Sequence, residues 1–291
     1  MRVMITGGGG LLARALAACA PQDAEVSLRS HSELDIADAS VVSRELARER
    51  PEVVINAAAY TQVDTAETET SAAERSNAIG ATVLAAACRA ASARLVHVST
   101  DYVFDGSSSS AWQPTDVPQP LNVYGASKRR GELGVIKELG KRALIVRSSW
   151  LYGATGRNIL TRLIGLAAAR PSLTIVADQI GAPTSLPSLA GALWELAAQQ
   201  NGGVFHWTDS GVASWYDFAV AAAEEAVQAR LLPRMPEIVA ISSDQYPTAA
   251  RRPRFSVLDK RSTEALIGRQ APHWRSNLRL VIADIARGVR G

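Results

Sequence analysis

The chain has 291 residues, of which 47% are hydrophobic and 20% charged. This composition is typical of a globular protein and excludes a disordered one. The formal net charge is only +3, and the basic residues are spread along the chain, so no nucleic-acid partner is predicted. The length corresponds to one large domain or two of ordinary size.

Neither the start of the chain nor any later segment has the pattern of a targeting or membrane segment. The apolar run after Arg2 ends at Ile5, before a glycine cluster, and is too short for a signal peptide. One of the longest apolar runs, residues 163–169, is flanked by Arg162 and Arg170, and a membrane span needs about 20 apolar residues. The two cysteines cannot build a disulfide framework. We therefore expect a reduced, cytoplasmic protein with no membrane partner.

Short apolar runs alternate with alanine-rich segments in the first half of the chain. The expected strands lie at residues 2–6, 25–28, 53–55, 94–99 and 143–147, and the expected helices at 11–19, 39–50 and 70–91. Strands that are almost continuously apolar are typical of a parallel sheet with helices on both faces. We predict a doubly wound α/β fold of the Rossmann type in residues 1–149.

The pattern changes after residue 149, where loops lengthen and prolines gather. Further helices are expected at residues 158–170, 186–199 and 216–229. Such a region is typical of a smaller domain that covers the C-terminal edge of the sheet, where ligands bind in this class of fold. Residues 150–291 are expected to form mainly a substrate-binding domain, with residues 186–208 returning to the first domain.

A glycine cluster joins the first expected strand to the first expected helix. Gly7 to Gly10 precede Leu11 and Leu12, and glycines at such a turn let a pyrophosphate approach the amide groups of a helix N-terminus. The third glycine of the usual spacing is replaced by Ala13, which is small enough for close packing of helix on sheet. A glycine-rich turn without a ligand is the alternative.

A tyrosine and a lysine four residues apart form the second signal. Tyr124 and Lys128 would share one face of a helix, where the lysine can lower the pKa of the phenol and make it a proton donor or acceptor. The alternative is a surface tyrosine beside a solvated lysine. Ser99 and Thr100, which end an expected central strand, favour the functional interpretation because they place a hydroxyl at the same edge of the sheet.

Together these residues resemble the extended short-chain dehydrogenase/reductase superfamily, and within it the dTDP-4-dehydrorhamnose reductase family. The motifs that carry the resemblance lie at residues 34–36, 56–59, 99–106, 120–125, 147–153, 178–184, 203–206, 214–219 and 246–253. They follow one another over nearly the whole chain, which is more specific than any single motif.

The resemblance implies a role for each matching residue. Tyr124 is the proton donor to the C4 oxygen of a keto sugar, Lys128 holds the nicotinamide ribose, and Thr100 hydrogen-bonds the reacting oxygen. The implied cofactor contacts are Gly7, Gly10, Leu11, Leu12, Asp35, Ile36, Ala57, Ala58, Ala59, Tyr102, Tyr124 and Lys128. The implied substrate contacts are Thr100, Asp101 and Trp150, although an aromatic residue after a strand is also typical of a core.

The choice of cofactor is predicted from Arg29, at the end of the second expected strand. An acidic residue at this place favours NAD, whereas an arginine accommodates the 2′-phosphate of NADP. No acid follows before Glu33, and the guanidinium of Arg29 can make charge-assisted bonds to a phosphate. NADPH is therefore the expected cofactor, with NADH possible. The alternative is a solvent-facing arginine.

The implied activity is hydride transfer from NADPH to C4 of a dTDP-4-keto-6-deoxy sugar, converting dTDP-4-dehydro-L-rhamnose to dTDP-L-rhamnose. A nucleotide-sugar 4-epimerase or dehydratase is one alternative, but Tyr102 stands where dehydratases have a second acid after Asp101. A non-catalytic NADP-binding regulatory subunit is the other. Some relatives dimerise through a magnesium ion held by C-terminal glutamates; residues 278–291 contain no Glu, and no metal site is predicted. The deoxysugar, its C4 stereochemistry and the oligomeric state stay open.

Overall fold

The computed structural model describes residues 1–288. The elements of its first half alternate between strand and helix as the sequence predicts. They are β1 (Arg2–Thr6), α1 (Leu11–Ala18), β2 (Glu25–Arg29), α2 (Ala39–Glu49), β3 (Val53–Asn56), α4 (Gly80–Ala90), β4 (Arg94–Thr100), α5 (Val123–Leu139) and β5 (Leu144–Ser148). Each expected strand and helix limit of this region lies within a few residues of the observed one, apart from the helix expected over residues 70–91.

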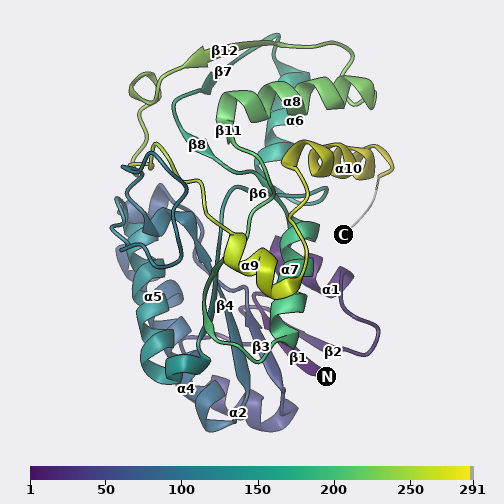
Figure 1. The fold of residues 1–291 in the computed structure, drawn as a ribbon. Helices are drawn as coiled ribbons and strands as arrows, with labels where there is room; N and C mark the ends of the chain where they lie inside the picture. Colours follow the sequence, from purple (N-terminus) through teal and green to yellow (C-terminus); the bar gives the residue numbers. More distant parts are fainter. Residues whose placement is uncertain (289–291) are drawn as a thin grey trace.

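Six parallel strands form the central sheet, in the order β10-β5-β4-β3-β1-β2, in which β10 (Gly203–His206) comes from the second half of the chain. The chain runs from β1 outward to β2 and then returns to the other side of β1 with β3. In a doubly wound sheet this reversal opens a crevice at the C-terminal ends of the strands, where ligands bind. The prediction of a Rossmann-type sheet is confirmed (Figure 1).

Helices cover both faces of the sheet, each over its own apolar layer. One layer includes Leu16 of α1 and Leu193 and Trp194 of α7 (Leu186–Ala198), and the indole nitrogen of Trp194 donates to the Leu16 carbonyl over 2.9 Å. The other layer lies under α2, α4 and α5. Ala13, fully buried in the first layer, allows α1 to lie close to the sheet.

The helix expected over residues 70–91 is divided by a wider, π-type turn. It consists of α3 (Thr70–Glu74), the π turn Arg75–Ile79, and α4. The side chain of Asn77, inside the π turn, donates to the Tyr60 carbonyl over 3.0 Å and accepts from the Tyr60 amide over 2.8 Å. Asn77 thus anchors the segment after β3, and π turns of this kind often occur at functional sites.

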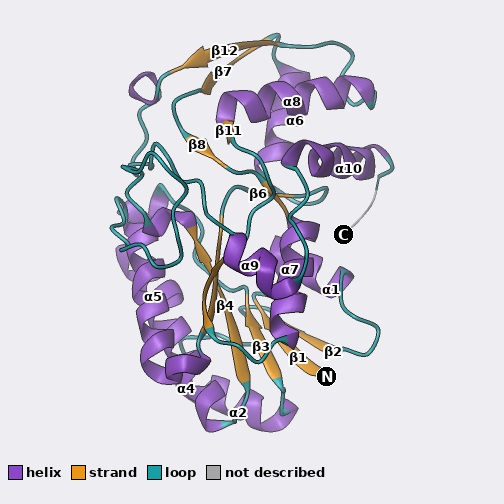
Figure 2. Cartoon of the chain, viewed as in Figure 1, coloured by secondary structure: helices purple, strands orange, loops and turns teal. Residues whose placement is uncertain are grey.

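The second half of the chain packs around its own helices above the sheet edge (Figure 2). Its longer elements are α6 (Ile159–Ala169), β7 (Ser172–Val176), α8 (Trp215–Gln228), β12 (Glu237–Ile241) and α10 (Trp274–Ala286). Phe218 and Leu278 are fully buried between these helices. The short helix α9 (Arg261–Ile267) lies instead against α7 and β10, beside the sheet. Two short ladders consist of two-residue strands: β6 (Leu151–Tyr152) pairs with β9 (Thr184–Ser185), and β8 (Ile180–Gly181) pairs with β11 (Ala213–Ser214).

The chain returns to the first region between these elements. α7 lies against α1, and β10 (Gly203–His206) adds a strand beside β5. This arrangement supports our division into residues 1–149 and 150–291 with a returning segment at 186–208, which remains a proposal. No helix within residues 1–288 is long and apolar enough to cross a membrane.

Candidate active site

The glycine turn after β1 brings the backbone unusually close to the loop after β3. Gly7 has a φ of +75°, and a Cβ at this position would lie 2.8 Å from the amide nitrogen of Ala58. The amide of Gly10 donates to the Gly7 carbonyl over 2.7 Å, and Gly10 is the N-cap of α1. A Cβ at Gly9 would meet nothing within 4 Å. Gly9, Gly10 and Leu11 border a large cavity, so the N-terminus of α1 is open to a ligand, as a phosphate site requires.

A cavity of about 1070 Å³ lies along the C-terminal ends of the strands, and it begins at this glycine turn. The predicted cofactor contacts that line it are Gly7, Gly10, Leu11, Leu12, Asp35, Ile36, Ala57, Ala58, Ala59, Tyr124 and Lys128. Its size and its glycine cradle fit a dinucleotide. The two predicted contacts outside this lining are Arg29 and Tyr102.

Arg29 is turned away from the cavity, which corrects the expectation that its side chain reaches a 2′-phosphate there. Its guanidinium lies 2.8 Å from Glu49 and 3.5 Å from Glu45, both on α2, and also donates to the Leu28 carbonyl. Two carboxylates from the helix that follows thus neutralise the charge on which the prediction depended. The basic side chains that do line the cavity are those of Arg14, His31, Arg75 and Arg157, and no motif had marked them.

A series of hydrogen-bonded, buried side chains holds the three alanines after β3 at the cavity wall. The hydroxyl of Thr6 donates to the side-chain oxygen Oδ1 of Asn56 over 2.7 Å, and the same oxygen accepts a hydrogen bond from the backbone amide of Ala58. The Asn56 amide group lies 3.0 Å from Nδ1 of His97. Because the side-chain oxygen of Asn56 fixes the backbone at Ala58, the loop keeps its path beside Gly7.

Tyr124 and Lys128 lie one turn apart on α5, and both line the cavity. The ammonium of Lys128 donates to the Val98 carbonyl over 2.7 Å; burial lowers its pKa to about 8, although the charge of Glu132 opposes this shift. Burial also raises the pKa of Tyr124 to about 12, against the hydrogen bonding of Thr100. Lys128 is not among the groups that shift this pKa, so its expected lowering of the phenol pKa stays a prediction. Tyr124 retains its proton at neutral pH, as a proton donor must.

A buried ion pair lies one further turn along the same face of α5. Glu132 is fully buried; its carboxylate accepts two hydrogen bonds from Arg147 of β5, at 2.8 and 2.7 Å, and one from the Ser99 hydroxyl of β4 at 2.7 Å. Arg129 contributes a fourth bond at 2.9 Å. The network joins the helix that carries Tyr124 and Lys128 to the neighbouring strands. The sequence analysis did not identify Glu132, although its spacing of four from Lys128 was a usable signal.

Thr100 and Asp101 follow one another at the end of β4, where the sequence placed them, but both are nearly covered. Thr100 is 6% exposed and Asp101 2% exposed. Ser256, also buried, lies beside Asp101 and comes from the segment before α9. Neither Thr100 nor Asp101 lines the large cavity. The substrate contacts expected of Thr100 and Asp101 therefore stay predictions, and the burial of Asp101 is the more complete of the two.

Trp150 belongs to a stacked aromatic pair. Its ring lies flat on that of Trp215, with 3.5 Å between centroids and 4° between planes. Its backbone has a φ of +51°, which is uncommon for a residue other than glycine. A Cβ at Gly181 would lie 2.7 Å from the Trp150 ring. Trp150 is thus held from two sides after β5, and Trp215 is a candidate substrate-side residue that sequence reasoning had only quoted within a motif.

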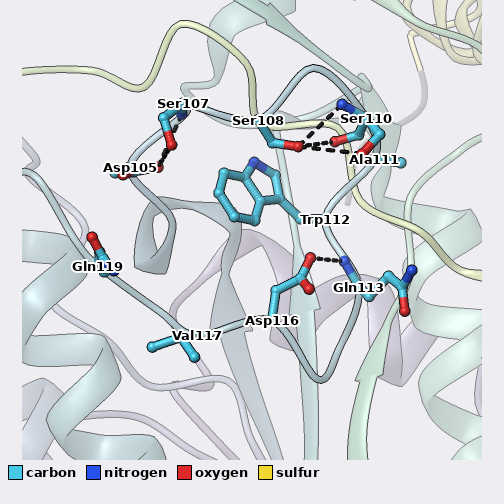
Figure 3. A pocket seen from close by; sticks show the side chains of 10 residues that line it. All are labelled: Asp105, Ser107, Ser108, Ser110, Ala111, Trp112, Gln113, Asp116, Val117 and Gln119. Carbon is cyan, nitrogen blue, oxygen red and sulfur yellow. Dashed lines mark hydrogen bonds between the residues drawn. The ribbon is translucent and has the colours of Figure 1, made fainter.

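A second, smaller hollow of about 450 Å³ lies over the loop of residues 105–119 (Figure 3). Trp112 is at its centre, stacked on Phe104 with 4.6 Å between centroids, and its indole donates to the Phe255 carbonyl over 3.0 Å. This contact ties the loop to the segment that carries Ser256. Neither Tyr124 nor Lys128 lines this hollow. We therefore assign the candidate active site to the large cavity, which both residues line.

The fold and the site together define a class. A Rossmann-type sheet with a glycine turn at its first helix, and a tyrosine, a lysine and a threonine at its C-terminal edge, is the arrangement of the NAD(P)-dependent oxidoreductases of the short-chain dehydrogenase/reductase type. No group of three or more His, Cys, Asp or Glu side chains in residues 1–288 is arranged to hold a metal ion.

Comparison with known proteins narrows this class. The family model described as "RmlD substrate binding domain" matches residues 1–287. A dTDP-4-dehydrorhamnose reductase of Aggregatibacter actinomycetemcomitans is 40% identical, over 97% of this chain and 98% of its own. A dTDP-4-keto-6-deoxy-D-glucose reductase of Streptomyces niveus is 39% identical over 88% of each chain.

Solved structures agree with these relatives. A dTDP-4-dehydrorhamnose reductase of Bacillus anthracis in complex with NADP has a TM-score of 0.91 and 35% identity, covering 97% of this chain and 99% of its own. The chain belongs to the dTDP-4-dehydrorhamnose reductase family.

Proposed function

We propose that this protein reduces the 4-keto group of a dTDP-4-keto-6-deoxy sugar with NADPH, forming dTDP-L-rhamnose from dTDP-4-dehydro-L-rhamnose. The observation that carries the proposal is the placement of Tyr124 and Lys128 on the wall of a dinucleotide-sized cavity that begins at the Gly7–Gly10 turn. The relatives named dTDP-4-dehydrorhamnose reductase support this choice of substrate, and the NADP complex of the Bacillus anthracis protein supports NADPH as the cofactor.

The residues of this chain divide the work of binding and proton transfer. The amides after Gly7 hold the pyrophosphate, and the loop of Ala57 to Ala59 lines the path of the cofactor toward α5. The chemistry that NADPH supplies there is a hydride for the C4 carbon. Tyr124 donates its phenolic proton to the C4 oxygen, for which its raised pKa keeps it protonated. Lys128 holds the nicotinamide ribose, and Thr100 hydrogen-bonds the reacting oxygen.

Net consumption of the cofactor separates this proposal from its alternatives. A reductase consumes one NADPH for each sugar reduced, whereas a dehydratase or an epimerase returns the hydride to the sugar. Purified protein with dTDP-4-keto-6-deoxyglucose, a 3,5-epimerase and NADPH should show loss of NADPH absorbance in step with dTDP-rhamnose, identified by NMR. A change of the sugar without net NADPH loss would overturn the proposal, and binding of NADPH without turnover would indicate a regulatory subunit.

The identity of the sugar is tested in the same experiment. The Streptomyces niveus relative is named for a keto sugar that has not passed through the 3,5-epimerase. Omitting the epimerase should therefore stop turnover if dTDP-4-dehydro-L-rhamnose is the substrate. Continued turnover without the epimerase would assign the unepimerised keto sugar instead. NADH in place of NADPH should support a slower reaction.

A further inference from the structure

The hydroxyl of Thr100 has a nearly complete set of partners within the protein. It donates toward Oδ1 of Asp101 over 3.1 Å and accepts the amide of Tyr102 over 3.2 Å. A threonine hydroxyl has one proton and can accept two hydrogen bonds. The hydroxyl therefore has one hydrogen-bonding position left, which serves either Tyr124 or the reacting oxygen.

The charge of Asp101 decides what that remaining position can do. An ionised carboxylate only accepts, so it takes the single proton of Thr100, and the position that is left is a lone pair. Such a threonine cannot donate to a keto oxygen, and it accepts the phenolic proton of Tyr124 instead. A protonated Asp101 donates to the Thr100 oxygen, which frees the Thr100 proton for the keto oxygen and leaves the Tyr124 proton directed at the substrate.

We infer that Asp101 is a positioning residue that must carry its own proton, so that Thr100 donates a hydrogen bond to the keto oxygen during the reduction proposed above. No covalent bond changes at Asp101, because it acts only through the direction of the Thr100 hydroxyl. The inference rests on the proposed function for its substrate, while the protonation of Asp101 is a property of the protein alone.

The surroundings of Asp101 favour the neutral carboxyl. It is 2% exposed, no positively charged group is paired with it within residues 1–288, and its Oδ2 has no hydrogen-bond partner there. An ionised carboxylate in such a place costs several kcal/mol unless it is paired. Burial accordingly raises the pKa of Asp101 to about 7, against the polar groups of Ser256 and Thr100.

Apart from Lys128, the titratable groups that face this site keep their charge over the same pH range. Burial raises the pKa of the Tyr102 phenol, on the same turn, and that of the Tyr124 phenol, on α5, well above neutrality. From the segment before α9, Arg252 faces Tyr102 and is held by two bonds of 2.6 Å to Asp64. Lys128 titrates near pH 8, which gives a separate and later effect on activity.

The experiment compares pH profiles of kcat/KM for the keto sugar in the wild type and in Asp101→Asn, Asp101→Ala and Asp105→Asn. The neutral form of Asp101 is lost as pH rises through about 7, so between pH 6 and pH 8 the wild type should lose about tenfold from Asp101 and about twofold more from Lys128, or about twentyfold in all. Both Asp101 variants should lose only about twofold, from Lys128, because neither can take the Thr100 proton as a charged acceptor. Asp105, on the adjoining loop, accepts only from Ser107, and its variant should keep the wild-type profile.

A second measurement does not depend on turnover. Infrared spectra of the wild type should contain the carbonyl stretch of a protonated carboxyl that disappears as pH rises through about 7 and is missing in Asp101→Asn. Ionised Asp101 at pH 6, or an unchanged alkaline limb in both Asp101 variants, would overturn the inference. Failure of the wild type to reduce any keto sugar would instead overturn the proposed function, and the infrared titration would still report on Asp101.

Discussion

The two halves of this molecule build their sides of the site by different means. In residues 1–149 the cavity wall follows from parallel strands that end at one edge, and it includes the glycine turn after β1 and the three alanines after β3. In residues 150–288 the corresponding features come from two-residue strands and loops, and side chains distant in sequence hold them, such as Trp150 on Trp215. A sheet positions ligands through the repeat of its backbone, whereas a loop region depends on individual side-chain contacts.

The largest expected effect is on the stability of the sheet half, through Glu132. Replacing it by Gln leaves Arg147, which is 1% exposed, without its counter-charge, and breaking a buried pair in this way costs about 3 to 5 kcal/mol. Urea unfolding of Glu132→Gln should show this loss in the free energy of unfolding. Arg129→Gln removes a partner whose side chain is 25% exposed and leaves the Arg147 pair intact, so it should cost about 1 kcal/mol or less.

The same pair makes stability depend on acid pH. Burial by itself would raise the pKa of Glu132, but the hydrogen bonds and charge of Arg147 hold it at about 2. A depressed carboxyl pKa contributes stability above the unfolded pKa of about 4.3. That contribution should disappear as pH falls from there toward 2, and unfolding of Glu132→Gln should lack it. Equal acid sensitivity in both proteins would contradict the assignment.

The next largest effect is expected on turnover, from the loss of the proposed proton donor Tyr124. Tyr124→Phe keeps the ring beside Tyr102, 5.9 Å between centroids, and removes the transferable proton. Turnover should fall by about 10²-fold or more, as is usual on loss of a general acid. NADPH affinity, measured by fluorescence titration, should change little. Turnover within a few-fold of the wild type would exclude Tyr124 as the proton donor.

A smaller effect is expected from the aromatic pair of the second half. Trp215→Leu removes the ring stacked on Trp150, and such pairs contribute about 0.5 to 1.5 kcal/mol beyond the burial of their area. We expect KM for the sugar nucleotide to rise about two- to tenfold, with the Kd of NADPH unchanged. An equal loss of affinity for both ligands would mean that the pair supports the whole fold and not the substrate side alone.

The smallest effect is expected from Arg29. Because Glu45 and Glu49 hold its guanidinium, Arg29→Ala should leave the ratio of kcat/KM for NADPH and NADH within about twofold. Arg14→Ala, which removes a cation that lines the cavity, is the matched comparison. A tenfold loss of the preference for NADPH in Arg29→Ala would instead support the expectation that Arg29 binds the 2′-phosphate.

Much of the site in the first half was predictable because its signals are local. A glycine turn between a strand and a helix, the spacing of four between Tyr124 and Lys128, and a threonine at the end of a central strand all place their groups through backbone geometry. The cavity lining at Leu11 and Ala57 followed from the same reasoning and from the family resemblance. The division of residues 70–91 was not predictable, because the side chain of Asn77 responds to Tyr60, which lies outside the helix.

The sequence by itself determined the doubly wound sheet, the order of its elements and the edge at which the chemistry lies, because parallel strands all end on one side whatever their side chains contact. Only the tertiary structure decided the direction of Arg29, the stacking of Trp150 and the burial of Asp101. Each depends on a partner distant in the chain: the carboxylates of α2, the ring of Trp215, and the segment of Ser256 that covers Asp101. At these three positions, at or just beyond the ends of strands, side-chain direction and desolvation are set by what packs against the residue, which the pattern of the strands does not specify.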